Sequence, residues 1–212
     1  MKVELISYTP EASGLCSEAA AVCTNSPNGY RSLQHSMESG HESVLEHAVF
    51  TFRVEGLSRA ALAQLTRHRL ASFSVQSQRY VKLDNPELVI PESIKQSAYA
   101  EEVETTMRFV LYLYERMLQD GIPAEDVRYI TPQAVTTSLV VTMNVRELRH
   151  FFTLRCCNRA QWEIRHLADG MLKLCKKAAP PLFADAGPGC VSVTCPEKNP
   201  CGHPRRKDEW DG

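Results

Sequence analysis

Three stretches of the chain have the hydrophobic pattern of β-strands. Residues 2–8 alternate between apolar and polar side chains, and Phe50, Phe52 and Val54 recur at every second position of the next stretch. Residues 134–144 are rich in β-branched side chains, which pack well on a pleated surface. We therefore predict a strand in each of these stretches.

Other segments repeat their apolar residues at every third or fourth position, which is typical of helices. Leu57, Ala61 and Leu65 recur every four residues, for example. Asn144 followed by Glu147 three residues later has the pattern of a helix N-cap. The predicted helices span residues 11–23, 31–40, 57–69, 97–119, 144–157 and 159–179.

The order of these elements favours an α+β fold, because a few strands are mixed with long helices without regular β–α alternation. After Ala186 the composition changes to glycine, proline, cysteine and charged residues with no helical or strand period. We therefore divide the chain into a main domain, residues 1–186, and a tail, residues 187–212.

Composition excludes several classes of protein. The 212 residues include 24 Lys and Arg against 25 Asp and Glu, a net charge of −1, which argues against a general nucleic-acid coat. No apolar run approaches the length of a membrane span. Glu4 stands where an export signal would be apolar, and the scattered cysteines suit reduced thiols, so we expect a cytoplasmic protein.

Basic residues gather at Arg67, His68 and Arg69, at the end of the predicted helix 57–69. Cations at a helix C-terminus are favoured by about 0.3–1 kcal/mol each, which accounts for one or two of them. Three adjacent residues of a helix point in three directions, so one of them faces inward or across the fold. A buried guanidinium needs an anion there, since an unpaired buried charge is costly.

The segment after this basic row supplies more donors for an anion. Ser77 and Arg79 are two residues apart, so on an extended segment they face the same way. Together with Arg67 they would form a cradle for a phosphate monoester, because guanidinium groups offer forked donors to phosphate oxygens. The residues thus suggest a nucleotide-like anion without identifying it.

Arg155 lies on the apolar face of the predicted helix 144–157, seven residues after Leu148 and four after Phe151. Two interpretations are open: a structural arginine paired with a core carboxylate, or an arginine that binds a ligand. Arg146 and His150 are four residues apart on another side of this helix and would contact a different part of a ligand.

Three other groups of residues are weaker candidates for chemistry. His41 and His47 are six residues apart, which is not the spacing of a zinc-protease helix. Cys156 and Cys157 are more typical of core packing than of a nucleophile. The tail residues Cys190, Cys195, Cys201 and His203 fit no common zinc-finger spacing, so we predict no metal site.

Taken together, the motifs resemble those of the flavin-dependent thymidylate synthases. R-H-R followed after seven residues by serine is present at residues 67–77, with Arg79 two residues further on. GHESVLEHAVFTF at residues 40–52 resembles a second family segment. The resemblance covers about residues 1–183, with these matching positions in order: Gln64, Arg128, Asn144-Val145-Arg146, Arg155 and AQWEIR at residues 160–165.

This resemblance implies a twisted, mostly antiparallel sheet with long helices in a single catalytic domain, which assembles as a homotetramer with its sites at subunit interfaces. It implies FAD binding by Ser43, Arg67, His68, Arg69, Asn144, Val145, Arg146 and His150. It implies that deoxyuridine monophosphate (dUMP) is bound by Gln64, Arg67, Gln76, Ser77, Gln78, Arg79, Arg128 and Arg155, with Arg155 as the catalytic residue.

The implied reaction is reductive methylation of dUMP to dTMP, with methylenetetrahydrofolate as carbon donor and NADPH as the reductant of FAD. The chain departs from many relatives at Val75, where they have glutamate, and at His150, where they have asparagine. Two rival functions are a nucleotide- or nucleic-acid-binding module without catalysis and a phosphohydrolase. The chain shows no convincing carboxylate cluster for a phosphohydrolase, and we expect neither nucleic acid nor a membrane as partner.

Overall fold

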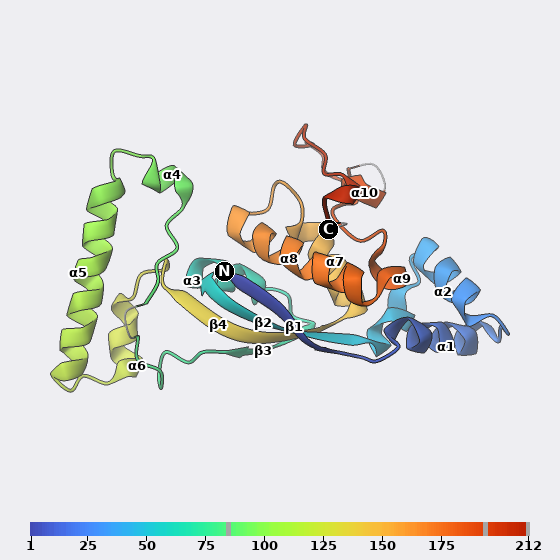
Figure 1. Ribbon diagram of the computed structural model, residues 1–212, viewed down its shortest axis with the longest axis horizontal. Coiled ribbons are helices and arrows are strands. Elements are labelled where there is room, and N and C mark those ends of the chain that lie inside the picture. The colour runs from blue at the N-terminus through green and yellow to red at the C-terminus, as the bar shows by residue number, and fades with distance from the viewer. Residues whose placement is uncertain (84–85, 193–194, 211–212) are drawn as a thin grey trace.

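A four-stranded antiparallel sheet forms the centre of the computed structural model, which describes residues 1–83, 86–192 and 195–210 (Figure 1). Its strands in spatial order are β1 (Lys2–Tyr8), β2 (Val49–Ser58), β4 (Thr136–Asn144) and β3 (Ala71–Val75). Every neighbouring pair is antiparallel. The α+β class and the three predicted strands are confirmed, whereas β3 was not predicted.

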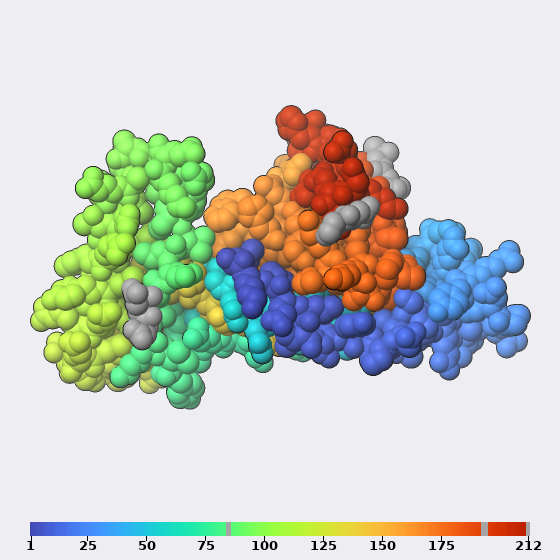
Figure 2. All heavy atoms as spheres, in the orientation of Figure 1, coloured from blue at the N-terminus to red at the C-terminus, as the bar shows by residue number. Residues whose placement is uncertain are grey.

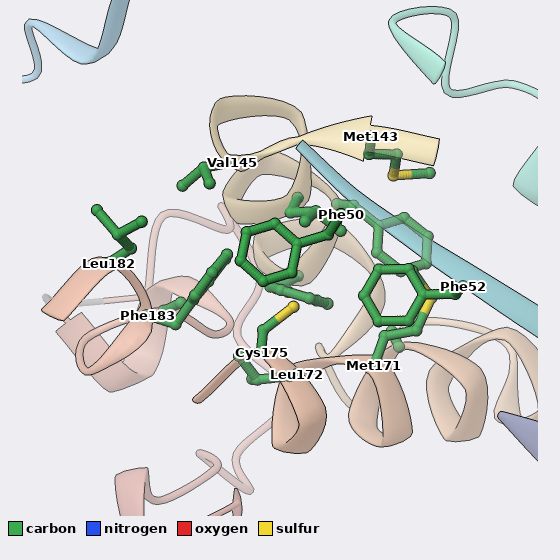
Figure 3. Packing of buried hydrophobic residues seen from close by; sticks show 14 of the residues in the cluster. Phe50, Phe52, Met143, Val145, Met171, Leu172, Cys175, Leu182 and Phe183 are labelled. Carbon is green, nitrogen blue, oxygen red and sulfur yellow. The ribbon is translucent and has the colours of Figure 1, made fainter. Parts of the chain in front are cut away.

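One face of the sheet packs against α7 (Val145–Arg155) and α8 (Trp162–Ala178), which lie together on that side of it (Figure 1). Phe50, Phe52 and Val54 are buried there, as their alternation predicted. In Figure 3, Phe52 lies beside Met171 of α8, and Phe50 points toward Cys175 of the same helix. Full burial stabilises such side chains by roughly 1.5–3 kcal/mol each, so this layer provides much of the core.

The other face of the sheet is polar, because the pleat turns every second residue away from the core. Ser72 and Ser74 of β3 are exposed on it. Thr51 and Thr142 lie opposite each other on β2 and β4, and their hydroxyl groups are 2.9 Å apart. This difference between the faces fixes the register of the strands.

The N-terminal helices agree closely with the predicted ones. They are α1 (Ala12–Thr24) and α2 (Gly29–Glu38), followed by the 3₁₀ helix η1 (Glu42–His47). Leu65, in contrast, is the last residue of α3 (Arg59–Leu65), so the prediction of a helix over residues 57–69 is wrong at both ends. Residues 57 and 58 belong to β2, and the chain must leave the helix after Thr66 to reach the start of β3.

An arm of helices projects from the end of the sheet (Figures 1 and 2). It consists of α4 (Glu92–Lys95), α5 (Ala100–Gln119), α6 (Ala124–Val127) and the 3₁₀ helix η2 (Arg128–Ile130). Tyr114 of the long helix is buried, but Tyr99 at its start is 66% exposed. Phe109 and Tyr112 are exposed as well, so α5 presents large apolar side chains that its own chain does not cover.

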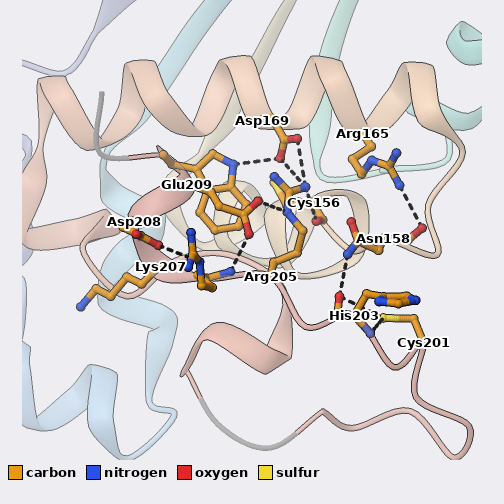
Figure 4. Close-up of polar contacts among 12 residues, drawn as sticks. Cys156, Asn158, Arg165, Asp169, Cys201, His203, Arg205, Lys207, Asp208 and Glu209 are labelled. Carbon is orange, nitrogen blue, oxygen red and sulfur yellow. Dashed lines mark hydrogen bonds and ion pairs between the residues drawn. The ribbon is translucent and has the colours of Figure 1, made fainter.

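The last described segment folds back on α8, starting with α9 (Pro180–Phe183) and α10 (Gly189–Ser192) and ending with the 3₁₀ helix η3 (Lys207–Trp210). Trp210 is only 1% exposed and donates from Nε1 to Asp169 at 2.9 Å. Arg205 lies between Asp169 and Glu209 and contacts both (Figure 4). The predicted division after residue 186 stays a prediction, although the described part of the tail packs on the main domain.

Cys157, Cys190, Cys195 and Cys201 line a cavity of about 330 Å³ beside this segment. Among residues 1–83, 86–192 and 195–210, no three His, Cys, Asp or Glu side chains are grouped so that they could hold a metal ion. Residues 193–194 and 211–212 of the predicted tail lie outside the described residues. Across the described ranges, no helix is both long and apolar enough to cross a bilayer.

Candidate active site

Strand pairing places the basic row beside the start of α7. Ala71, the first residue of β3, pairs with Met143, and β4 ends one residue later at Asn144. The turn that carries residues 67–69 therefore meets the point where β4 passes into α7. Arg67 and Arg69 are exposed on this turn, whereas His68 is buried. One of the three basic residues does face inward, but from a turn and not from the predicted helix.

The N-terminal end of α7 is shaped for an anion. Asn144 caps the helix by accepting from the backbone N–H of Glu147 at 2.8 Å, which confirms the predicted N-cap. Val145 is buried below it, and the exposed Arg146 pairs with Glu46 of η1. The helix dipole and the first N–H groups make such an end favourable for negative charge. Ser43 is exposed on η1, which packs against α7.

His68 connects two residues of α7 through its ring nitrogens. Nδ1 is 2.9 Å from the Glu147 carboxylate, and Nε2 accepts from Nε of Arg155 at 3.1 Å. The ring of His68 also packs edge-on against Phe151, with ring centres 4.9 Å apart. Both ring nitrogens thus have protein partners, so the imidazole has no nitrogen left over for the flavin. The predicted contact of His68 with FAD stays a prediction.

Burial lowers the pKa of His68 most strongly, and the neighbouring Arg155 cation lowers it further. The hydrogen bond that His68 makes to Glu147 acts in the opposite direction and raises this pKa. Burial also lowers the pKa of Arg155, with a smaller contribution from the nearby Arg67 cation. His68 is therefore neutral at pH 7, and Arg155 lies in a site that already holds positive charge.

The partners of Arg155 decide between its two interpretations. They are Nε2 of His68 and, at 3.4 Å from Nη2, the backbone oxygen of Gln64 near the end of α3. Within the described part of the chain, no carboxylate pairs with this half-buried guanidinium. The structure therefore favours an arginine kept for a ligand over an arginine that neutralises a core carboxylate.

A second group of predicted site residues follows β3. The backbone N–H of Gln76 donates to Ser138 at 2.9 Å, which extends the pairing of β3 with β4. The hydroxyl of Ser77 then accepts from the N–H of Arg79 at 3.2 Å, in a short turn. Arg79 is exposed and donates to Glu125 at 2.9 Å.

Arg128 and Gln78 belong to the same group. Arg128 donates from Nε to the backbone oxygen of Glu125 at 3.0 Å, and Gln78 donates to Thr131 at 3.3 Å. Both line a cavity of about 470 Å³, together with Arg59. The two arginines give this cavity a positive lining next to the Ser77 turn.

The basic turn precedes β3 in the chain, and the second group follows it. A strand rises about 3.4 Å per residue, so Ala71 and Val75 are about 14 Å apart. The structure brings one group together around α7, made up of Ser43, Gln64, Arg67, His68, Arg69, Asn144, Val145, Arg146, His150 and Arg155. It brings a second group together beyond β3, made up of Gln76, Ser77, Gln78, Arg79 and Arg128.

Sequence reasoning missed Glu147 as a residue of this site. Its position three residues after Asn144 suggested a capping box, but its carboxylate is turned toward His68. A signal was present, because Glu147, Phe151 and Arg155 are spaced by four and share one face of a helix.

Comparisons with known proteins agree with this geometry. A family model described as "Thymidylate synthase complementing protein" matches residues 4–181 of the chain. A flavin-dependent thymidylate synthase of Geobacter sulfurreducens is 46% identical over 212 residues, covering 93% of this chain and 91% of that protein. One of Pyrococcus horikoshii is 44% identical over 236 residues, covering 99% of this chain and 97% of that protein.

A solved structure is similar as well. It is the flavin-dependent thymidylate synthase of Helicobacter pylori in complex with FAD and dUMP, which superposes with a TM-score of 0.72. The two sequences are 29% identical, and the match covers 88% of this chain and all of the other.

Proposed function

The chain belongs to the family of flavin-dependent thymidylate synthases, and on this basis we propose that it converts dUMP to dTMP by reductive methylation. The proposed carbon donor is methylenetetrahydrofolate, and the proposed source of electrons is NADPH. The half-buried Arg155, which donates to neutral acceptors and pairs with no carboxylate of the described chain, is the observation that carries this proposal.

The residues around the start of α7 fit FAD. Arg69 and Arg146 are exposed cations near the N-terminus of an 11-residue helix, and Arg67 adds positive charge close to Arg155. A diphosphate would complement both the cations and the helix dipole. When bound, FAD would supply hydride transfer, which protein side chains alone do not provide. The residues proposed to hold it are the members of the α7 group other than Gln64 and Arg155, with Arg146 exchanging Glu46 for the ligand.

Arg155 would act on the pyrimidine. Carbon C5 of uracil is a weak nucleophile, so the ring must become more electron-rich before it attacks. A guanidinium fixed beside the N3 and O2 edge stabilises the negative charge that develops there, without reorganisation during the reaction. Arg155 has five N–H donors and uses Nε and Nη2 within the chain, so others can reach the base.

The group beyond β3 would hold the phosphate and ribose of dUMP. The hydroxyl of Ser77 and the guanidinium groups of Arg79 and Arg128 are the donors that a phosphate monoester needs. Arg79 is exposed, so it can leave Glu125 for a ligand at small cost. Ser77 has no base partner among its contacts, so we propose a binding role for it and no nucleophilic one.

We further propose that one site combines the α7 group of one copy with the Ser77 group of another copy in a homotetramer. The exposed aromatic side chains of α5 offer apolar surface for such an assembly. The cytoplasmic location expected from the sequence is part of this proposal.

The purified protein tests the proposed function directly. A yellow preparation whose flavin absorbance bleaches with NADPH in the absence of oxygen is expected, and dUMP with methylenetetrahydrofolate should then yield dTMP, measured by mass spectrometry. A colourless protein that forms no dTMP when FAD is added would contradict the proposal. If its affinity for nucleotides also fell steeply with salt, a binding module would be the better conclusion.

A further inference from the structure

His68 contacts three residues on one face of α7. Glu147, Phe151 and Arg155 are spaced by four, so they lie in one row along the helix. Side chains of a helix lean toward its N-terminus, which brings the long Arg155 side chain back toward Glu147. The imidazole of His68 packs on Phe151 and reaches the polar atoms on either side of it.

The hydrogen bonds determine where the proton of His68 lies. An arginine Nε can only donate, so Nε2 of His68 must accept and carries no proton. The proton of the neutral ring is then on Nδ1, where it is donated to the Glu147 carboxylate. With the proton on the other nitrogen, two N–H groups would face each other and Arg155 would lose its acceptor.

The burial of this contact makes the arrangement specific. Glu147 is 6% exposed and His68 is 5% exposed, so water cannot easily replace either partner. A buried carboxylate without a hydrogen-bond donor is costly, and His68 provides its donor. The ring of His150 lies near His68 with centres 6.1 Å apart, but it contacts neither nitrogen.

We propose that Glu147 is a positioning residue, which sets the orientation of Arg155 toward the pyrimidine by fixing the tautomer of His68. This inference rests on the proposed function, because it assigns Glu147 to the same site. Glu147 itself touches no ligand. Its effect passes through one imidazole to the guanidinium that would contact the base.

Glu163 provides a matched control, because it is also a buried carboxylate that accepts two hydrogen bonds. It is 3% exposed and accepts from the backbone N–H of Ser58 at 2.7 Å and from the Ser58 hydroxyl. Both contacts support the start of α3 and involve no residue of the proposed site. If Glu147 had a purely structural role, substitutions at Glu147 and Glu163 would have similar effects on Tm, dUMP affinity and kcat.

The test compares Glu147→Gln, Glu147→Leu and Glu163→Gln in the flavin-loaded full-length protein. Glutamine keeps an oxygen that accepts from Nδ1, whereas leucine has a similar volume and no acceptor. We expect Glu147→Leu to weaken dUMP binding about tenfold or more and to lower kcat with unchanged flavin content. Glu147→Gln should restore most of both values, and Glu163→Gln should lower Tm while leaving Kd and kcat near those of the unchanged protein.

A second readout does not depend on turnover. In protein labelled with ¹⁵N-histidine, the shifts of the two ring nitrogens report which one carries the proton, and His68→Gln assigns the signal. The unchanged protein should show the Nδ1–H form of His68, and Glu147→Leu should lose it.

Three results would overturn the inference: an Nε2–H form of His68 in the unchanged protein, wild-type dUMP affinity in Glu147→Leu, or equal losses in Glu147→Gln and Glu147→Leu. Failure of the proposed function is recognised separately, since the unchanged protein would then bind no FAD or form no dTMP.

Discussion

The two groups of site residues differ in how firmly the chain holds them. Around α7, the contacts from Glu147 through His68 to Arg155 are buried and run between side chains of one core. Beyond β3, Arg79 is exposed and pairs with Glu125 at the surface, where such pairs are worth about 0–1 kcal/mol. The guanidinium proposed to face the base is therefore set by the fold, while the guanidinium proposed to face the phosphate is free to adjust to its ligand.

The largest effect is expected from Arg155→Ala, which removes the guanidinium that the fold holds in place. Loss of a fixed donor to developing charge typically lowers kcat about 10²–10³-fold, and we expect at least this decrease in dTMP formation. Flavin content should be unchanged, because the α7 cations near the helix start remain. Steady-state assays and flavin absorbance measure both quantities.

Arg159→Ala is the control for that variant, because Arg159 is an exposed arginine four residues away that pairs with Glu197. It should retain normal turnover. Substantial dTMP formation by Arg155→Ala would falsify the assignment of the catalytic role.

Arg79→Ala removes the exposed guanidinium proposed to face the phosphate, and it should act mainly on dUMP binding. Loss of a charge-assisted contact to phosphate corresponds to about 10–100-fold in affinity, so KM for dUMP should rise by this factor with a smaller change in kcat. The remaining affinity should depend less steeply on salt concentration. A decrease in kcat as large as that of Arg155→Ala, with unchanged KM, would show that the two groups do not have separate roles.

Lowering the pH should reduce both the stability of the protein and its affinity for dUMP, because His68 becomes protonated. Because burial and Arg155 lower its pKa, the unfolded chain takes up the proton first, near the ordinary value of about 6.5. The stability that neutral His68 contributes is therefore present above this pH and is lost as pH falls below it. Protonated Nε2 would face Arg155, so dUMP affinity should decline at still lower pH, where the folded protein takes up this proton.

Calorimetric titrations of dUMP measure the change in affinity, and thermal melts measure the change in stability. Both should be run between pH 5 and about 8, because histidine is the side chain whose ordinary pKa lies in this range. His68→Gln should flatten both profiles. An acid decline that persists unchanged in this variant would point to another group.

The smallest effect is expected from Cys156→Ala and Cys157→Ala together. Burial raises the pKa of the Cys156 thiol well above its ordinary value, so it is a poor nucleophile at pH 7. We expect kcat to change less than about twofold and stability to fall by about 1 kcal/mol, as for a typical core substitution. Loss of turnover in a folded double variant would require a catalytic thiol.

Local patterns of the sequence predicted the parts of this fold that depend on local physics. The alternation of Phe50 with Phe52 and the cap at Asn144 were both confirmed. The end of α3 at Leu65 was not predicted, because it is set by pairing of β3 with β4, a contact between residues more than 60 positions apart. Glu147 was assigned to a cap for the same reason: its partner His68 lies 79 residues away.

Mixed assemblies test most directly whether the two groups meet across copies of the chain. The experiment uses two variants, the single variant Arg155→Ala and the double variant Arg79→Ala/Arg128→Ala. Each should have little activity alone at low dUMP. The two are co-expressed in equal amounts with different tags, and mixed assemblies are purified through both tags. If each site combines the α7 group of one copy with the Ser77 group of another, random mixing restores both intact parts in about a quarter of the sites. The account predicts that fraction of normal dTMP formation in the mixed preparation, and activity no higher than the average of the two separate variants would contradict it.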